Sequence, residues 1–229
     1  MINIKDLPDP IINNDLKKVY TPSDDSYLII DYFKKNINYN YFDGRNIKKI
    51  KRILDIGTGN GIIAIFFQII KTQNPNFNPE IYASDISEDS INCAKSNEKV
   101  NNFENEIIFI QSDLFKSFPD TLKNSFDIIV FNPPYLPSSE LINDSINKAK
   151  IDYSWDGGKK GYEIIIKFLE NVNKFIKKDS YMYYISSSKS NLNKLVDYIV
   201  EKGFKNQILE KKHIFFEDII LNRLEIENI

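Results

Sequence analysis

The sequence contains very few of the residues that form most metal sites and nucleophilic centres in proteins. It has one cysteine, Cys93, and one histidine, His213, among 229 residues. A single cysteine excludes an internal disulfide framework, and the shortage of both residues argues against a zinc site supplied by this chain. It also argues against Ser-His-Asp and Cys-His catalysis, and no G-x-S-x-G sequence is present. We expect His213, which lies far in sequence from every other candidate residue, to be structural.

Long apolar runs and a surplus of one charge are also absent. Thirty basic and 32 acidic residues give a net charge of -2, so there is no basic field to attract nucleic acid. No apolar run is long enough to span a membrane, and residues 1–10 lack a signal-peptide core. We therefore expect a reduced, cytoplasmic setting without a membrane partner. The length suits a single domain, 1–229, with a lead-in and helix over 1–50 and the core over 51–229.

Glycine is scarce, at eight residues, but three glycines lie together at Gly57, Gly59 and Gly61. They separate the apolar run 52–56 from the apolar run 62–67, which predicts a strand, a loop and a buried helix. Such a loop lets a ligand lie against the backbone at a helix N-terminus. The dinucleotide and phosphate-loop patterns both fail here. The pattern D-x-G-x-G-x-G, which begins at Asp55, instead resembles that of class I S-adenosylmethionine-dependent methyltransferases.

Further strands are predicted to end in polar residues that suit the same cofactor. The strand 80–85 ends in Asp85, which is placed to accept hydrogen bonds from ribose hydroxyls, unless it only caps the next helix beside Ser87. The strand 106–110 leads to Asp113 and Leu114, placed to bind and cover an adenine ring, although Asp113 could be a solvated loop acid. In a doubly wound sheet, all these strand ends line one crevice.

The apolar run 126–130 leads to Asn132-Pro133-Pro134-Tyr135. The prolines end the strand because they cannot donate to a sheet ladder. The Asn132 side chain and the Pro133 carbonyl could accept both hydrogens of a planar NH2 group, while Tyr135 stacks on its plane. The alternative is an ordinary proline turn, which these four residues alone do not exclude.

The remaining segments complete a doubly wound α/β fold with a seven-stranded, mostly parallel sheet and a C-terminal antiparallel hairpin. The segment 23–36 predicts a helix capped by Ser23, and 38–50 a polar loop. A long loop over 136–156 suggests a lid or binding loop, closed by the glycines of 155–161. We expect helices over 162–178 and 189–201, a strand over 180–186, and hairpin strands over 204–216 and 219–226.

Several motifs together resemble the release-factor glutamine methyltransferases, in particular their compact archaeal and eukaryotic branch. The likeness rests on Asn132 to Tyr135, on Tyr20-Thr21-Pro22-Ser23-Asp24-Asp25-Ser26, on Asp55 to Gly59, and on Trp155 to Gly161. Members often have Glu at the position of Asp55 and Glu-Asp-Thr at 24–26, which are conservative differences. The resemblance implies a Rossmann-like methyltransferase that binds S-adenosyl-L-methionine. It would do so through the following residues: Ser26, Asp55, Gly57, Gly59, Asp85, Asp113, Leu114 and Asn132.

The resemblance further implies a substrate and a partner. The substrate would be the glutamine side chain of an exposed Gly-Gly-Gln loop in a class I translation termination (release) factor. The partner would be a small zinc-binding activator subunit, and nucleic acid would not be required. A second reading is methylation of the amino group of adenine in a nucleic acid, through the same four residues, Asn132 to Tyr135, which we call the clamp. It would normally bring a target-recognition domain or a basic face, which this chain does not show. A non-catalytic subunit of the same fold would lack the clamp.

Overall fold

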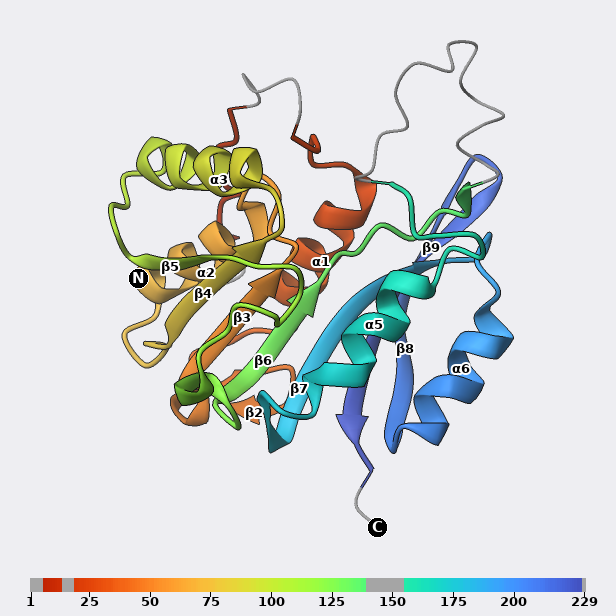
Figure 1. Cartoon of the computed structure of the whole chain (residues 1–229). Helices are drawn as coiled ribbons and strands as arrows, with labels where there is room; N and C mark the ends of the chain where they lie inside the picture. Colours follow the sequence, from red (N-terminus) through yellow and green to blue (C-terminus); the bar gives the residue numbers. More distant parts are fainter. Residues whose placement is uncertain (1–5, 14–18, 139–154, 228–229) are drawn as a thin grey trace.

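A seven-stranded sheet in the order β5-β4-β3-β6-β7-β9-β8 forms the centre of the fold (Figure 1). This computed structural model describes residues 6–13, 19–138 and 155–227. The five strands from β5 to β7 run parallel, whereas β9 is antiparallel to β7 and β8, so the predicted sheet and hairpin are confirmed. The strands are β3 (Arg52–Ile56), β4 (Glu80–Asp85), β5 (Ile107–Gln111), β6 (Phe126–Phe131), β7 (Ile176–Ser187), β8 (Phe204–Ile214) and β9 (Glu217–Ile226).

Helices cover both faces of the sheet, because alternate residues of each strand point to opposite sides. In β6, Ile128 and Val130 belong to a core cluster with α1 and α2, which we call the rear core. Ile129 and Phe131 belong to a second cluster with α5 and α6, which we call the front core. Figure 1 shows α5 and α6 in front of the sheet and α1 and α2 behind it. The helices are α1 (Asp24–Lys35), α2 (Ile62–Gln73), α3 (Glu88–Val100), α5 (Glu163–Val172) and α6 (Leu192–Glu201).

The segment 38–50 is not the polar loop that its composition predicts. It contains a small hairpin, β1 (Tyr41–Phe42) and β2 (Arg45–Asn46), followed by the 3-10 turn η2 (Ile47–Lys49). Phe42, Ile47 and Ile50 are fully or almost fully buried. These three apolar residues pack with α1 and α2 in the rear core, and this packing orders a segment that is otherwise rich in Asn and Lys.

Several predicted boundaries are also wrong. The strand predicted over 180–186 spans 176–187, and the helix predicted from 189 begins at Leu192. In the hairpin, β8 ends at Ile214 instead of 216 and β9 begins at Glu217 instead of 219. The helix predicted over 162–178 ends at Val172, and Ile176 already belongs to β7. The side chain of Ile176 is buried against the front core, so its apolar character fits either element and periodicity could not separate them. The third parallel strand begins at Ile107, one residue later than predicted, and a short 3-10 turn, η3 (Asp120–Leu122), follows it.

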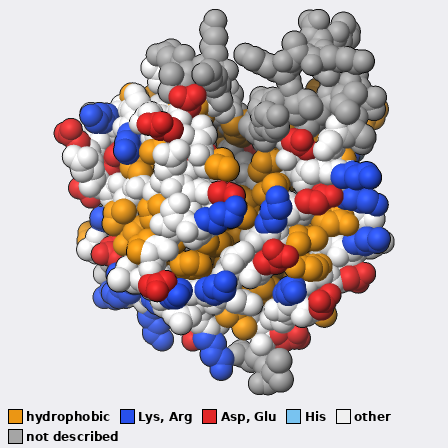
Figure 2. Space-filling view, in the orientation of Figure 1, with side chains coloured by type: hydrophobic (Ala, Val, Ile, Leu, Met, Phe, Trp, Pro, Cys, Tyr) orange, Lys and Arg blue, Asp and Glu red, His pale blue; other side chains and the backbone are white. Residues whose placement is uncertain are grey.

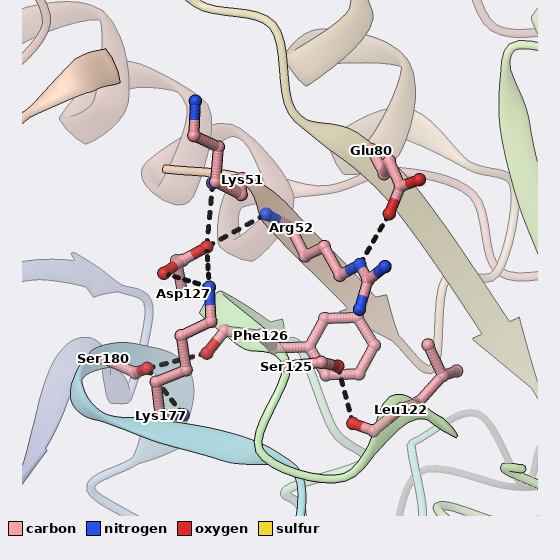
Figure 3. Close-up of polar contacts among 9 residues, drawn as sticks. All are labelled: Lys51, Arg52, Glu80, Leu122, Ser125, Phe126, Asp127, Lys177 and Ser180. Carbon is pink, nitrogen blue, oxygen red and sulfur yellow. Dashed lines mark hydrogen bonds and ion pairs between the residues drawn. The ribbon is translucent and has the colours of Figure 1, made fainter. Parts of the chain in front are cut away.

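A buried carboxylate joins three strands at the end of the sheet opposite their carboxyl ends (Figure 3). Asp127 of β6 is 4% exposed. Its Oδ2 accepts hydrogen bonds from the backbone N–H groups of Lys51 (2.8 Å) and Arg52 (3.0 Å), and both of its oxygens lie 2.8 Å from Lys177 Nζ of β7. This contact fixes β3, β6 and β7 to one another, which leaves their carboxyl ends free to carry a site. Within the described residues, no helix combines the length and hydropathy that crossing a membrane would require.

Candidate active site

The glycine loop lies between β3 and α2 and holds its backbone open. Gly57, Gly59 and Gly61 all have positive φ, of 70°, 56° and 87°. A Cβ at Gly59 would meet no atom within 4 Å, so this side of the loop faces open space. A ligand could therefore approach the backbone there.

Asp55 lies beneath this loop and is 2% exposed. Its Oδ2 accepts from Thr58 Oγ1 at 2.6 Å and from the Ala64 backbone N–H at 3.2 Å, so the carboxyl ties the loop to the first turn of α2. Burial raises the pKa of Asp55 to about 7. The contacts of Asp55 thus shape the glycine loop from below.

Asp85 ends β4 beside the same loop. Its Oδ2 accepts from the Gly59 backbone N–H at 3.0 Å and its Oδ1 accepts from the Ser87 N–H at 2.9 Å. Burial raises the pKa of this carboxyl above its usual range. Ser87 caps α3 through its own hydroxyl, which accepts from Ser90 N, as the sequence predicts. Both Asp85 and Ser87 therefore hold the start of α3, and Asp85 in addition bridges β4 to the glycine loop.

We expect Asp85→Ala to weaken binding of S-adenosylmethionine or its demethylated product by about 1.5–3 kcal/mol, the range for hydrogen bonds to a charged group. Titration calorimetry measures this directly. Ser87→Ala is the matched control, because it weakens the same helix terminus and leaves the carboxylate in place. Equal losses in the two variants would reduce Asp85 to a capping residue.

Asp113 and Leu114 follow β5. The Asp113 side chain is 44% exposed and pairs with Lys116 on the surface. Such an exposed ion pair contributes little stability, so the carboxylate stays available to a ligand. Leu114 has a positive φ of 51°, which is uncommon outside glycine, and it packs on the front core. No hydrogen bond within the described part of the chain joins Asp113 to Asp85 or Asn132.

Asn132 lies directly after β6, where its side chain is held on one side only. Its Nδ2 donates to Ser26 Oγ of α1 at 3.3 Å. Its Oδ1 is buried and has no hydrogen-bond partner within the described residues. A buried amide oxygen without a partner is costly, so an external N–H group is its natural complement. The Pro133 carbonyl likewise receives no hydrogen bond from the described residues.

A buried acid that the sequence pattern did not single out organises this region. Asp25, 2% exposed, accepts from Tyr20 Oη (2.6 Å), the Ser26 backbone N–H (2.6 Å) and Tyr135 Oη (3.1 Å). Burial and the nearby Asp25 raise the pKa of both tyrosines, which therefore remain donors. In the sequence, Asp25 is part of the motif Tyr20 to Ser26, and no role of its own is predicted for it. Ser23 occupies the N-cap position of this helix as predicted, but its side chain makes no capping hydrogen bond.

Tyr135 does not present an open ring face in this arrangement. The ring is 3% exposed, and it lies edge-on to Trp155 with a centroid distance of 6.5 Å. Together with its bond to Asp25, this places Tyr135 as a wall of the site rather than as the stacking surface that the sequence favours. Trp155 also contacts Tyr20 edge-on at 4.9 Å, so it closes the N-terminal segment over the clamp.

The glycine-rich segment 155–161 braces the clamp from the other side, as its glycines predict. The Leu136 N–H donates to the Trp155 carbonyl (3.0 Å) and the Gly157 N–H donates to the Leu136 carbonyl (2.9 Å). A Cβ at Gly157 would lie 2.8 Å from the Pro134 oxygen and 2.9 Å from the Tyr135 carbonyl carbon. Only glycine allows this close approach. Most of the predicted loop 136–156 lies outside the described residues.

Comparison with known proteins places these features in a family. Residues 47–213 match the family described as methyltransferase domain. A Methanocaldococcus jannaschii protein named protein N5-glutamine methyltransferase is 31% identical over 89% of this chain and 90% of its own length. The eRF1 methyltransferase catalytic subunit of Schizosaccharomyces pombe is 26% identical, over 86% and 85%.

Solved structures share the fold. The E. cuniculi Mtq2–Trm112 complex, responsible for methylation of the eRF1 translation termination factor, matches with a TM-score of 0.59 and 22% identity, over 91% of this chain and 98% of the other. A ribosomal protein L11 methylase from Lactobacillus delbrueckii matches with a TM-score of 0.61 and 18% identity, over 93% and 84%. The chain therefore belongs to the class I S-adenosylmethionine-dependent methyltransferases, in the family of the release-factor glutamine methyltransferases.

Proposed function

We propose that this protein methylates the side-chain amide nitrogen of a glutamine in a class I translation termination factor. The observation that supports this most directly is that neither the buried Oδ1 of Asn132 nor the carbonyl of Pro133, the next residue, has a hydrogen-bond partner within residues 6–13, 19–138 and 155–227. A primary carboxamide offers two N–H donors in one plane, which these two acceptors complement. The named activities of the relatives supply the identity of the protein that carries the amide.

The crevice has the chemistry that S-adenosylmethionine requires. We propose that Asp85 accepts from the ribose hydroxyls, that Asp113 and Leu114 bind and cover the adenine, and that the open backbone at Gly57 and Gly59 holds the remainder. Ser26 of α1 and Asn132, the residue after β6, are joined by a hydrogen bond and would border the cofactor. When bound, the cofactor supplies a methyl group on a sulfonium, which needs no further activation.

The residues of the clamp act by orientation. An amide nitrogen is a weak nucleophile, because its lone pair is delocalised into the carbonyl. By accepting both N–H groups, Asn132 and Pro133 would fix the direction of that lone pair and reduce the entropy loss of reaching the transition state. Ser26, Asp25 and Tyr135 act as positioning residues behind them. The methylated nitrogen is acidic and releases its proton to water, so no strong base is needed, and His213 pairs with Asp218 on the β8–β9 hairpin.

The proposed substrate is tested by incubating the protein with a recombinant termination factor and S-adenosylmethionine, followed by peptide mapping with mass spectrometry. One added methyl group on the glutamine of the Gly-Gly-Gln loop is expected. The control factor has asparagine at that position, which keeps the amide but shortens its reach by one methylene. Equal methylation of the control, or modification elsewhere, would contradict the clamp geometry.

We further propose that a small activator subunit covers the edge of the sheet at β5. An edge strand presents unpaired backbone groups, which natural proteins usually protect. Ile108 of β5 is 43% exposed, Ile86 after β4 is 67% exposed, and hydrophobic side chains are visible around this edge in Figure 2. The relative in the E. cuniculi complex is itself assembled with a second protein.

The activator proposal predicts that the isolated protein is poorly soluble or weakly active and gains activity with the subunit. Ile108→Lys should abolish co-purification, since a charge buried at an interface is strongly unfavourable. Val200→Lys, an equally drastic change of a valine that is 58% exposed on α6, should not. A monodisperse and fully active isolated protein would show that no such subunit is needed.

A further inference from the structure

The tip of the β8–β9 hairpin exposes two adjacent phenylalanines. Phe215 and Phe216 are 87% and 91% exposed, whereas no other large hydrophobic residue in the described part of the chain exceeds 67%. Isolated exposed apolar residues are normal, but two neighbouring aromatic rings in nearly full contact with water are not explained by folding. Aromatic side chains of this kind are the usual anchors of protein interfaces.

The backbone of the tip makes the choice of phenylalanine unfavourable. Ile214 pairs with Glu217, so residues 215 and 216 form a two-residue hairpin loop. Phe215, the first of them, has a positive φ of 51°. Glycine, asparagine or aspartate would adopt this conformation more readily. The phenylalanine therefore serves something other than the turn.

The tip lies at the end of the sheet toward which β6 points and where the clamp begins (Figure 1). Phe131, the residue before Asn132, is level with Tyr184 of β7 and Asn222 of β9. Phe216 lies six residues before Asn222, so the tip extends about 20 Å beyond that level. An arm of this length is not needed to hold a single amide group. It suits a macromolecule that lies across the rim while one of its side chains enters the crevice.

Hydrogen bonds connect the residues next to the tip to the clamp. Glu217 Oε2 accepts from Ser187 Oγ at 2.7 Å, and the Ser188 N–H donates to the Asp218 carbonyl at 2.9 Å. Ser190 Oγ, two residues further on, donates to the Tyr135 carbonyl at 2.7 Å. A partner bound to the tip is thus held at a fixed distance from Asn132.

The charges beside the tip favour a protein partner over a polyanion. His213 pairs with Asp218 at 2.7 Å and Lys212 pairs with Asp24 at 2.7 Å, so two of the three adjacent basic residues near the tip are matched by acids, and only Lys211 has no ion pair within the described residues. Acidic and basic side chains are also interspersed over the face seen in Figure 2. A nucleic-acid or anionic membrane surface would instead select a cluster of unpaired cations.

We propose that Phe215 and Phe216 are an anchor for the protein substrate, inserted into an apolar depression of the termination factor next to its methylated loop. This inference rests on the proposed function, and it adds a docking surface outside the catalytic crevice. The rings contribute to substrate binding rather than to the methyl-transfer step, so their loss should raise KM and leave kcat unchanged.

The test is the double variant Phe215→Gly with Phe216→Ser, assayed on the full-length factor with the activator subunit present. We expect KM to rise by about tenfold or more and kcat to stay within about twofold. The Tm should be unchanged or higher, because glycine relieves the positive φ. Val200→Ser, which removes an exposed apolar side chain from α6, should leave all three quantities unchanged.

Unchanged KM in the double variant would overturn this inference alone. Failure of the wild-type protein to methylate the factor would overturn it together with the proposed function. Loss of activator binding, or loss of co-sedimentation with anionic lipid vesicles at unchanged KM, would reassign the rings to those partners and also contradict the proposal.

Discussion

Asn132→Ala is expected to lower turnover by about 10²–10³-fold, the size of effect seen when one preorganised polar group is removed from a reacting centre. The side chain donates one hydrogen bond, from Nδ2 to Ser26, and its buried Oδ1 has no partner in the part of the chain that the structure describes. Alanine removes that acceptor, and the substrate nitrogen then loses one of the two contacts that direct its lone pair. Single-turnover kinetics with a termination factor measure the loss.

Cofactor binding separates this effect from damage to the crevice. S-adenosylhomocysteine should bind the Asn132→Ala variant almost as tightly as the wild type, because Asp85 and the glycine loop are untouched. Asn132→Asp keeps two acceptor oxygens but cannot donate to Ser26, so its turnover should fall between that of the wild type and that of Asn132→Ala. If Asn132→Ala keeps turnover within about twofold of wild type, orientation by this amide is not the mechanism.

Asp127→Ala is expected to destabilise the fold by about 3 kcal/mol, because two backbone N–H groups of Lys51 and Arg52 lose a charged acceptor at once. Lys177 is 39% exposed and can be solvated, which keeps the effect below that of a fully buried pair. Chemical denaturation measures the free energy of unfolding. Cofactor affinity should not change at denaturant concentrations below the unfolding transition, since Asp127 lies at the end of the sheet opposite the candidate site.

Asp120→Ala is the matched control for this prediction. Asp120 also pairs with a lysine, Lys123, at 2.7 Å, but its side chain is 87% exposed. The loss of an exposed pair is expected to cost about 0–1 kcal/mol. Similar free energies of unfolding for the two variants would show that burial of Asp127 contributes nothing.

The sequence was sufficient for the parallel part of the fold because its strands are short, buried and apolar, with polar residues placed directly after them. Apolar runs end at Ile56 and Phe131, and β4 ends at Asp85, as the pattern predicts. The segment 38–50 was misread, since only three of its residues enter the core and its composition is that of a loop. Helix α5 was predicted too long because Ile176, a buried residue of β7, continues the apolar pattern of the helix.

Residues could be proposed for the candidate site from the sequence only where a residue type indicates a function by itself. Glycines, strand-end acids and Asn-Pro-Pro-Tyr met that condition. Asp25 did not, because an acid in the first turn of a helix is usually solvated, and only the fold shows that two tyrosines from distant positions donate to it. Phe215 and Phe216 read as part of an alternating strand, and their exposure follows from the position of the turn.

The most direct measurement is the transfer of radiolabelled methyl groups into an equimolar mixture of a termination factor, DNA and RNA, with the products separated afterwards. The account predicts label in the factor alone, at the glutamine of the Gly-Gly-Gln loop, and almost none with Asn132→Ala. Label in adenine of either nucleic acid, with the factor unmodified, would contradict it.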